Sequence, residues 1–153
     1  MNKLEKPEHA IKSAFWYWMA RGLSEWGNKD DLIWITIKVN GGLNGYQDRL
    51  SKLKKFKNIK EHANISGNYI FKDSEAYNTL IGSYAWGIWH DPAKRHLHGT
   101  GKKIENAKEG YFRTIELINQ GNTVKKPIYG NKTTDALKNS ATLHLVRLGG
   151  VVP

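Results

Sequence analysis

The sequence predicts a mainly α-helical fold, and three observations support this prediction. In the segments 8–20, 46–61 and 103–120, apolar side chains recur every three or four residues, which is the spacing of one helix face. Gly22 and Gly121 follow two of these segments, as glycines commonly follow a helix. Hydrophobic residues make up 39% of the 153 residues, which is enough to bury a core without disulfides.

The first expected helix covers residues 8–20 and begins behind Pro7, because proline is tolerated in the first turn of a helix. Its apolar face consists of Ile11, Ala14, Phe15 and Trp18. We expect a short turn next, formed by Ser24, Gly27 and Asn28.

The second expected helix runs from about residue 30 to residue 39. Asp30 and Asp31 suit its start, because a helix N-terminus carries a partial positive charge. The pair Gly41-Gly42 is expected to end it. A third helix over 46–61 has an apolar face of Tyr46, Leu50, Leu53 and Phe56.

The second half of the chain is less uniform. Residues 69–89 combine β-branched and aromatic residues, which favour a strand, with a Ser-Glu-Ala segment that suits the start of a helix, so both remain open. A polar loop is expected over 90–103, and the clearest helix of the chain over 103–120. A short helical piece near 135–139 and an alternating apolar segment around 143–148 complete the prediction.

Composition narrows the functional classes. The formal net charge of +10 favours an acidic or polyanionic partner. The absence of cysteine excludes disulfides, thiol catalysis and cysteine-based zinc sites. No apolar run is long enough to cross a bilayer, so no membrane partner is expected. The first residues do not resemble a signal peptide, and we expect cytoplasmic synthesis, with export by a route other than Sec left open.

Two segments near the N-terminus resemble a known family. They are KSAFWYWM at 12–19 and VNGGLNGYQDR at 39–49. Together they resemble the C-terminal half of glycoside hydrolase family 19, which comprises chitinases and related phage and bacterial endolysins with a lysozyme-like helical fold. The resemblance covers about residues 7–57. It implies a chitinase-like C-terminal helical lobe at 1–65 and a mixed helix-and-loop extension at 66–153, packed on the lobe without a clear linker.

The resemblance also implies a sugar-binding site. The backbone of Val39 and the side chains of Asn40 and Lys12 would contact the sugar, and Gly41 would let the backbone approach it. Arg49 would pair with a catalytic carboxylate and set its pKa. The alternative is purely structural: the Asn-Gly-Gly segment forms only a helix C-cap and turn, and Arg49 only holds helices together.

The catalytic groups of the family are missing from this chain. An inverting glycosidase needs two carboxyl groups, one as acid and one as base for water. In this family they come from segments ahead of the tryptophan-rich helix, with His-Glu-(Thr/Ser) and Tyr-x-Gly-Arg-Gly patterns, and neither pattern occurs here. We therefore expect a glycan-binding portion of a chitin or peptidoglycan hydrolase that is inactive alone. It resembles either the C-terminal portion of such an enzyme, expressed or encoded separately, or a degenerate relative. If the N-terminal half is encoded elsewhere, the partner is another polypeptide.

Further candidates lie between residues 83 and 98. Trp86 and Trp89 would stack on sugar rings, or alternatively pack in the core. His90, Asp91, His96 and His98 are residue types that bind metal ions. These four lie on one loop with no ligand fixed by a helix, so neither a metal nor a cofactor is expected.

Two competing functions remain. One is a non-catalytic cell-wall-binding, toxin-accessory or immunity protein. The other is a basic nucleic-acid-binding protein, for which the chain has the charge but no recognised motif. Lysines concentrate between residues 52 and 60, on an expected helix where a solvated face is the simpler interpretation.

Overall fold

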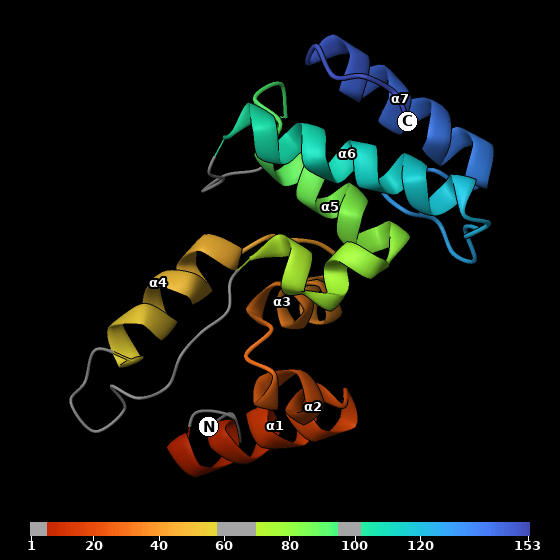
Figure 1. The fold of residues 1–153 in the computed structure, drawn as a ribbon. Coiled ribbons are helices and arrows are strands. Elements are labelled where there is room, and N and C mark those ends of the chain that lie inside the picture. The colour runs from red at the N-terminus through yellow and green to blue at the C-terminus, as the bar shows by residue number, and fades with distance from the viewer. Residues whose placement is uncertain (1–5, 58–69, 95–101) are drawn as a thin grey trace.

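The computed structural model describes residues 6–57, 70–94 and 102–153, which form seven α-helices and no strand (Figure 1). The predicted mainly α class is therefore confirmed. The α-helices are α1 (Pro7–Ala20), α2 (Leu23–Asn28), α3 (Leu32–Asn40), α4 (Tyr46–Lys57), α5 (Leu80–His90), α6 (Ile104–Asn119) and α7 (Thr134–Arg147). Two short 3-10 helices precede α5, namely η3 (Phe71–Asp73) and η4 (Glu75–Asn78).

The expected turn near residues 24–28 is helical. Glycine, serine and asparagine are weak helix formers, which is why the sequence of this segment predicts a turn. Gly22 has a left-handed backbone (φ 61°) that ends α1 and starts α2 at once. Leu23 is buried at 1% exposure, so the burial of its side chain stabilises the short helix against its propensity.

The ambiguous stretch 69–89 is also helical. The N-terminus of α5 is capped by the Thr79 hydroxyl, which accepts a hydrogen bond from the Gly82 N–H at 3.1 Å. The rest of α5 is buried on nearly all sides. A helix without a polar face shows no amphipathic period in its sequence, which explains why the pattern did not distinguish it from a strand.

At the C-terminus one helix, α7, replaces the expected short piece and apolar alternation. Its inward residues are Leu137, Ala141 and Leu145, spaced four apart as on one helix face. Leu143 is 67% exposed, so the alternation of leucines does not report a strand face.

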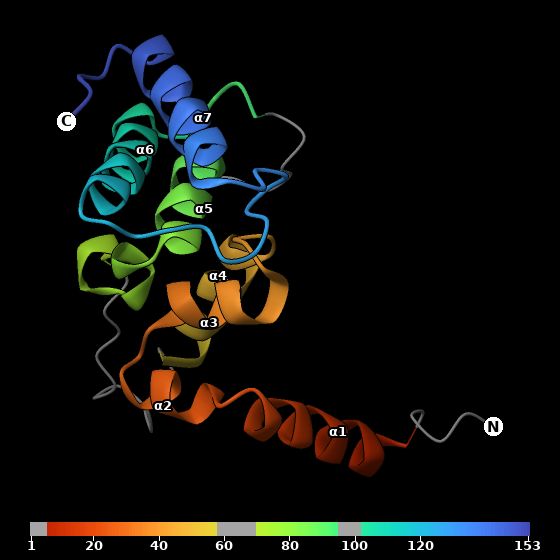
Figure 2. The same cartoon turned by 90° about the vertical axis from the view of Figure 1, so that its right-hand side faces the viewer.

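Helix α5 joins two hydrophobic clusters. Tyr84 and Ile88 pack with α6 and α7 in one cluster, whereas Ala85, Trp86 and Trp89 pack with α3, α4 and η3 in the other. Figure 2 shows α5 between the α6–α7 pair and α3. The boundary expected near residue 65 lies outside the described residues.

Glycines allow α5 and α6 to approach closely. A Cβ atom at Gly110 would overlap the backbone of Gly87, and one at Gly87 would lie 2.7 Å from the Tyr111 ring. Both positions lie inside helices, where glycine is otherwise unfavourable by about 1 kcal/mol relative to alanine. Close helix packing is therefore the reason for glycine here.

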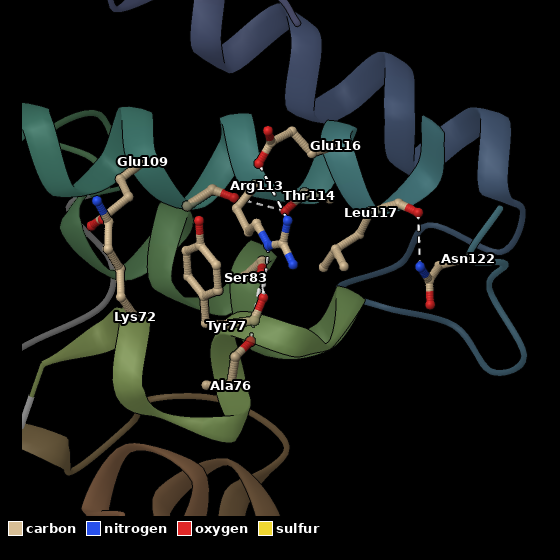
Figure 3. Close-up of polar contacts among 11 residues, drawn as sticks. Lys72, Ala76, Tyr77, Ser83, Glu109, Arg113, Thr114, Glu116, Leu117 and Asn122 are labelled. Carbon is tan, nitrogen blue, oxygen red and sulfur yellow. Dashed lines mark hydrogen bonds and ion pairs between the residues drawn. The ribbon is translucent and has the colours of Figure 1, made fainter. Parts of the chain in front are cut away.

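The 3-10 helices are attached to α6 by polar contacts (Figure 3). The Arg113 Nε–H donates to the Tyr77 carbonyl at 3.1 Å, and its guanidinium lies 4.4 Å from the centre of the Tyr77 ring. Lys72 and Glu109 form an ion pair at 3.8 Å. These contacts hold η3 and η4 against the side of α6.

Helix α1 extends away from the rest of the molecule and packs against α2 (Figure 2). The Tyr17 hydroxyl donates to the Val39 carbonyl at 3.4 Å, and Arg21 donates to the Lys38 carbonyl at 3.2 Å. Four large apolar side chains of α1 are more than 60% exposed, namely Ile11, Phe15, Trp16 and Met19. No described helix is both long and apolar enough to span a membrane.

Candidate functional site

The Asn-Gly-Gly segment forms a tight turn between α3 and α4. Gly41 (φ 68°) and Gly45 (φ 77°) have left-handed backbones, which glycine adopts without steric cost. The Asn40 side-chain amide donates to the Asn44 carbonyl at 2.6 Å, and an Arg49 Nη donates to the same oxygen at 3.0 Å. The structure thus brings two of the predicted site residues together on one carbonyl.

Asn40 and Arg49 each keep polar groups that are available to a ligand: Asn40 an acceptor and Arg49 donors. Asn40 is exposed, and only its NH2 group is used in the turn, so its amide oxygen faces no described partner. Arg49 is half-buried and pairs with no carboxylate among the described residues. Its guanidinium therefore keeps donors free for an acidic or acceptor-rich partner.

A groove of about 610 Å³ runs beside this turn, between α1–α2 and α3–α4. Val39 and Arg49 line it, and its charged residues are Asp30, Arg49 and Lys52. The remaining lining is mostly apolar and comprises Trp18, Gly27, Leu32, Ile35, Val39, Leu53 and Phe56. An apolar groove with a few polar groups suits a ligand that has both ring faces and hydroxyls.

The other predicted sugar contacts, Val39, Lys12 and Gly41, are not linked through the Asn44 carbonyl. The Val39 carbonyl already accepts the Tyr17 hydroxyl, so its backbone is partly engaged within the molecule. Lys12 is exposed on α1, and neither Lys12 nor Asn40 is among the described residues that line the groove. Gly41 is exposed in the turn, and a Cβ atom there would meet open space.

Sequence reasoning missed Tyr129, which approaches the turn from the loop before α7. A Cβ atom at Gly42 would overlap the Tyr129 hydroxyl, so the second glycine of the pair leaves room for this ring. Tyr129 also has a positive φ of 47°, which is uncommon for a tyrosine. A contact between residues so far apart in sequence leaves no local signal.

The two candidate stacking tryptophans are buried in the core. Trp86 and Trp89 are 6% and 2% exposed. Trp86 stacks on Phe71 with ring centres 4.7 Å apart and planes at 9°. Neither tryptophan presents an open ring face on which a sugar could stack.

Asp91 is fully buried and joins three helices. Its carboxylate accepts hydrogen bonds from the Ala93 N–H at 2.9 Å, the Tyr111 hydroxyl at 2.8 Å and the Arg147 guanidinium. Burial raises the pKa of Asp91, but these hydrogen bonds and the Arg147 charge outweigh burial, so the pKa lies below its usual value. Asp91 thus stays charged and links the end of α5 to α6 and α7.

Two basic residues near Asp91 have pKa values below their usual range. Burial lowers the pKa of His144, and the charges of Lys94 and Arg147 lower it further. Burial also lowers the pKa of Lys102, against the attraction of Asp91.

His90 is the last residue of α5, so the prediction that it lies on a loop with the other three candidate metal ligands is wrong. His96 and His98 lie outside the described residues. Among the described residues, no cluster of three or more potential metal ligands occurs.

The described lining of the groove does not contain a pair of carboxylates. Asp30 is the one acidic residue among its described lining residues, so two-carboxylate hydrolysis has no second partner there.

Comparisons of the chain with protein-family models, curated proteins and solved structures find no match.

Proposed function

We propose that this chain is the glycan-binding portion of a chitinase- or endolysin-like system, with a lysozyme-like helical lobe that recognises β-1,4-linked N-acetylglucosamine polymers. The polymer would be chitin or peptidoglycan, which places the function at a bacterial cell wall or a related surface. The single observation that carries the proposal is the convergence of Asn40 and Arg49 on the turn beside the groove.

The geometry supports a binding role for this turn. The free amide oxygen of Asn40 is an acceptor for a sugar hydroxyl or an N-acetyl N–H. Gly41 leaves its backbone open to a ligand, and the groove next to the turn offers apolar surface for ring faces. Lys12, which does not line the groove, would take part only if the polymer continued along α1.

We do not propose hydrolysis by the chain alone. Both carboxylates that inversion requires would come from an N-terminal half on a partner polypeptide. Arg49, which has no carboxylate partner among the described residues, would pair with one supplied in this way. The exposed apolar face of α1 supports such a partner, because a stable protein interface is more apolar than ordinary surface.

Co-sedimentation with insoluble chitin and with purified peptidoglycan tests the proposal. We expect retention at high salt, because hydrogen bonds and apolar contacts are less screened than exposed charges. Asn40→Ala should weaken retention about five- to tenfold, the effect of one lost polar contact. Arg49 still holds the Asn44 carbonyl in this variant, so the turn keeps one of its two hydrogen bonds.

Asn139→Ala is the matched control, because Asn139 is exposed on α7, far along the chain from the turn. Equal retention of both variants and the wild type would contradict the assignment of the site. Release of reducing ends by the isolated chain, at any pH from about 4 to 8, would contradict the claim that it is inactive alone.

A further inference from the structure

The loop between α6 and α7 contains a two-residue hairpin whose tip contacts the proposed glycan turn. Ile128 and Asn131 pair through two backbone hydrogen bonds, of 3.0 and 2.9 Å. The two residues between them, Tyr129 and Gly130, have positive φ values of 47° and 83°. Positive φ at both central positions is the mark of a type I′ turn.

Tyrosine is an unfavourable residue at the tip of such a hairpin. The first central position of a type I′ turn strongly favours asparagine, aspartate or glycine, because a left-handed backbone crowds a larger side chain. A strained position of this kind persists only where the surrounding structure holds it. The backbone of Tyr129 therefore directs attention to the contacts of its side chain.

The Tyr129 side chain covers the inner side of the turn between α3 and α4. Its hydroxyl fills the space that a Cβ atom at Gly42 would need, and Gly42 is buried. Gly42 does not have a positive φ, so the contact with Tyr129, and not the backbone conformation, is what requires a glycine there. Burial raises the pKa of Tyr129 to about 12, although contact with the Leu43 backbone opposes the rise. The hydroxyl is therefore enclosed against the turn.

The turn has a covered side and an open side. Its middle, residues 42–43, is buried, whereas Gly41 and Asn44 on either side are exposed. The Tyr46 N–H donates to the Leu43 carbonyl at 3.0 Å and closes the turn. A contact on the covered side thus fixes this segment without occupying the side that is open to a ligand.

The hairpin itself is anchored in the cluster formed by α5, α6 and α7. Ile128, next to Tyr129, is 7% exposed and belongs to that cluster. The Tyr129 ring lies 5.9 Å from the ring of Tyr84 on α5, measured between ring centres. Tyr129 therefore connects the packed C-terminal helices to a turn that is distant in sequence.

We propose that Tyr129 is a positioning residue of the candidate glycan site. Its hydroxyl holds residues 42–43 in place. The carbonyl that follows them, that of Asn44, then stays where it accepts from Asn40 and Arg49. The identity of the ligand in this inference rests on the proposed function, whereas the hold of Tyr129 on the turn does not.

Amide hydrogen exchange of the full chain without ligand, followed by NMR, tests the hold on the turn. Tyr129→Phe removes only the hydroxyl, and Tyr129→Asn removes the ring while suiting the left-handed position. In both variants, exchange of the Tyr46 N–H should accelerate about tenfold more than exchange of the α7 amides, because the turn opens locally. Tyr77→Phe is the matched control, because the Tyr77 hydroxyl points toward α6 (Figure 3).

Gly42→Ala tests the same contact from the turn. The added methyl group overlaps the Tyr129 hydroxyl, so exchange of the Tyr46 N–H should accelerate in this variant too. In the Tyr129→Asn background the methyl group meets no hydroxyl, so Gly42→Ala should add little further acceleration. Non-additivity of this kind is expected of residues in direct contact.

Titration of the same variants with chitohexaose tests the effect on binding. Tyr129→Phe should bind about five- to tenfold more weakly than the wild type, and Tyr77→Phe should bind equally well. A purely structural role of Tyr129 would lower the urea midpoint and leave the affinity of the folded chain unchanged.

The inference is overturned if the acceleration at Tyr46 does not exceed that in α7, if Gly42→Ala acts equally in both backgrounds, or if Tyr129→Phe binds as tightly as the wild type. Failure of the wild type to bind chitohexaose would contradict the proposed function instead. The exchange rates would then still decide whether Tyr129 holds the turn.

Discussion

At the scale of single residues, one backbone carbonyl organises the proposed site. The Asn44 oxygen accepts from both Asn40 and Arg49, although these residues lie on different helices. Their proximity could be predicted, because the glycine pair reverses the chain within a few residues. The buried position of Asp91 could not, because its partners Tyr111 and Arg147 are distant in sequence.

Asp91→Asn should lower the free energy of unfolding by about 2–4 kcal/mol at pH 7, since it removes a buried, hydrogen-bonded charge. The lowered pKa of Asp91 means that the wild type keeps this stabilisation above pH ~4 and loses it as the pH falls further. Urea denaturation from pH 7 to pH 3 measures both effects. The stability difference between wild type and variant should shrink below pH ~4, and a constant difference would contradict the assigned charge state.

At the scale of helices, close packing decides which segments are predictable. Helices α1 and α6 carry visible amphipathic patterns, and their predicted bounds agree with the structure to within a residue or so. Helix α5 lacks such a pattern because it is buried on nearly all sides. Its helical state depends on packing between two clusters, which the local sequence does not encode.

Gly110→Ala should destabilise the fold, because its methyl group would overlap the backbone of α5 at Gly87. Overpacking of this kind typically costs about 1–3 kcal/mol, which exceeds the gain in helix propensity of about 1 kcal/mol. Chemical denaturation measures the change. Asn139→Ala, on an exposed helical face, is the control and should stay within about 0.5 kcal/mol of the wild type. A more stable Gly110→Ala variant would show that α5 and α6 are not in close contact.

The exposed apolar face of α1 leads to a second prediction about the packing of helices. Phe15→Ala and Trp16→Ala should change the free energy of unfolding by less than about 0.5 kcal/mol, because both side chains are about 70% exposed. Leu23→Ala should cost about 2–5 kcal/mol, because Leu23 is buried. Thermal or urea unfolding of the three variants compares them. A large loss at Phe15 or Trp16 would mean that α1 packs on the rest of the chain in solution.

At the scale of the whole molecule, the net charge of +10 produces attraction to any polyanion. Binding to a random DNA duplex should therefore weaken at least tenfold between about 50 and 200 mM salt, as counterion release predicts. Retention on uncharged chitin should change little over the same range. Parallel binding assays at each salt concentration measure both. A salt-resistant, sequence-specific DNA complex would favour the nucleic-acid alternative instead.

The helical class and four of the seven described helices followed from periodicity, capping residues and glycines. The arrangement of the candidate site could be predicted from the sequence only in part. The link between Asn40 and Arg49 is local, whereas the contact of Tyr129 with Gly42 arises from distant segments. Such tertiary contacts leave no periodic trace in a single sequence.

The most direct test of the proposed function is to map an N-acetylglucosamine oligomer on the chain by backbone amide NMR. We predict saturable shifts at Val39 and in the turn from Gly41 to Gly45, with further shifts at the backbone amides of residues that line the groove. Asn40→Ala should reduce the affinity while leaving the spectrum of the rest of the chain unchanged. Absence of saturable shifts, or shifts confined to residues remote from α3 and α4, would contradict the account.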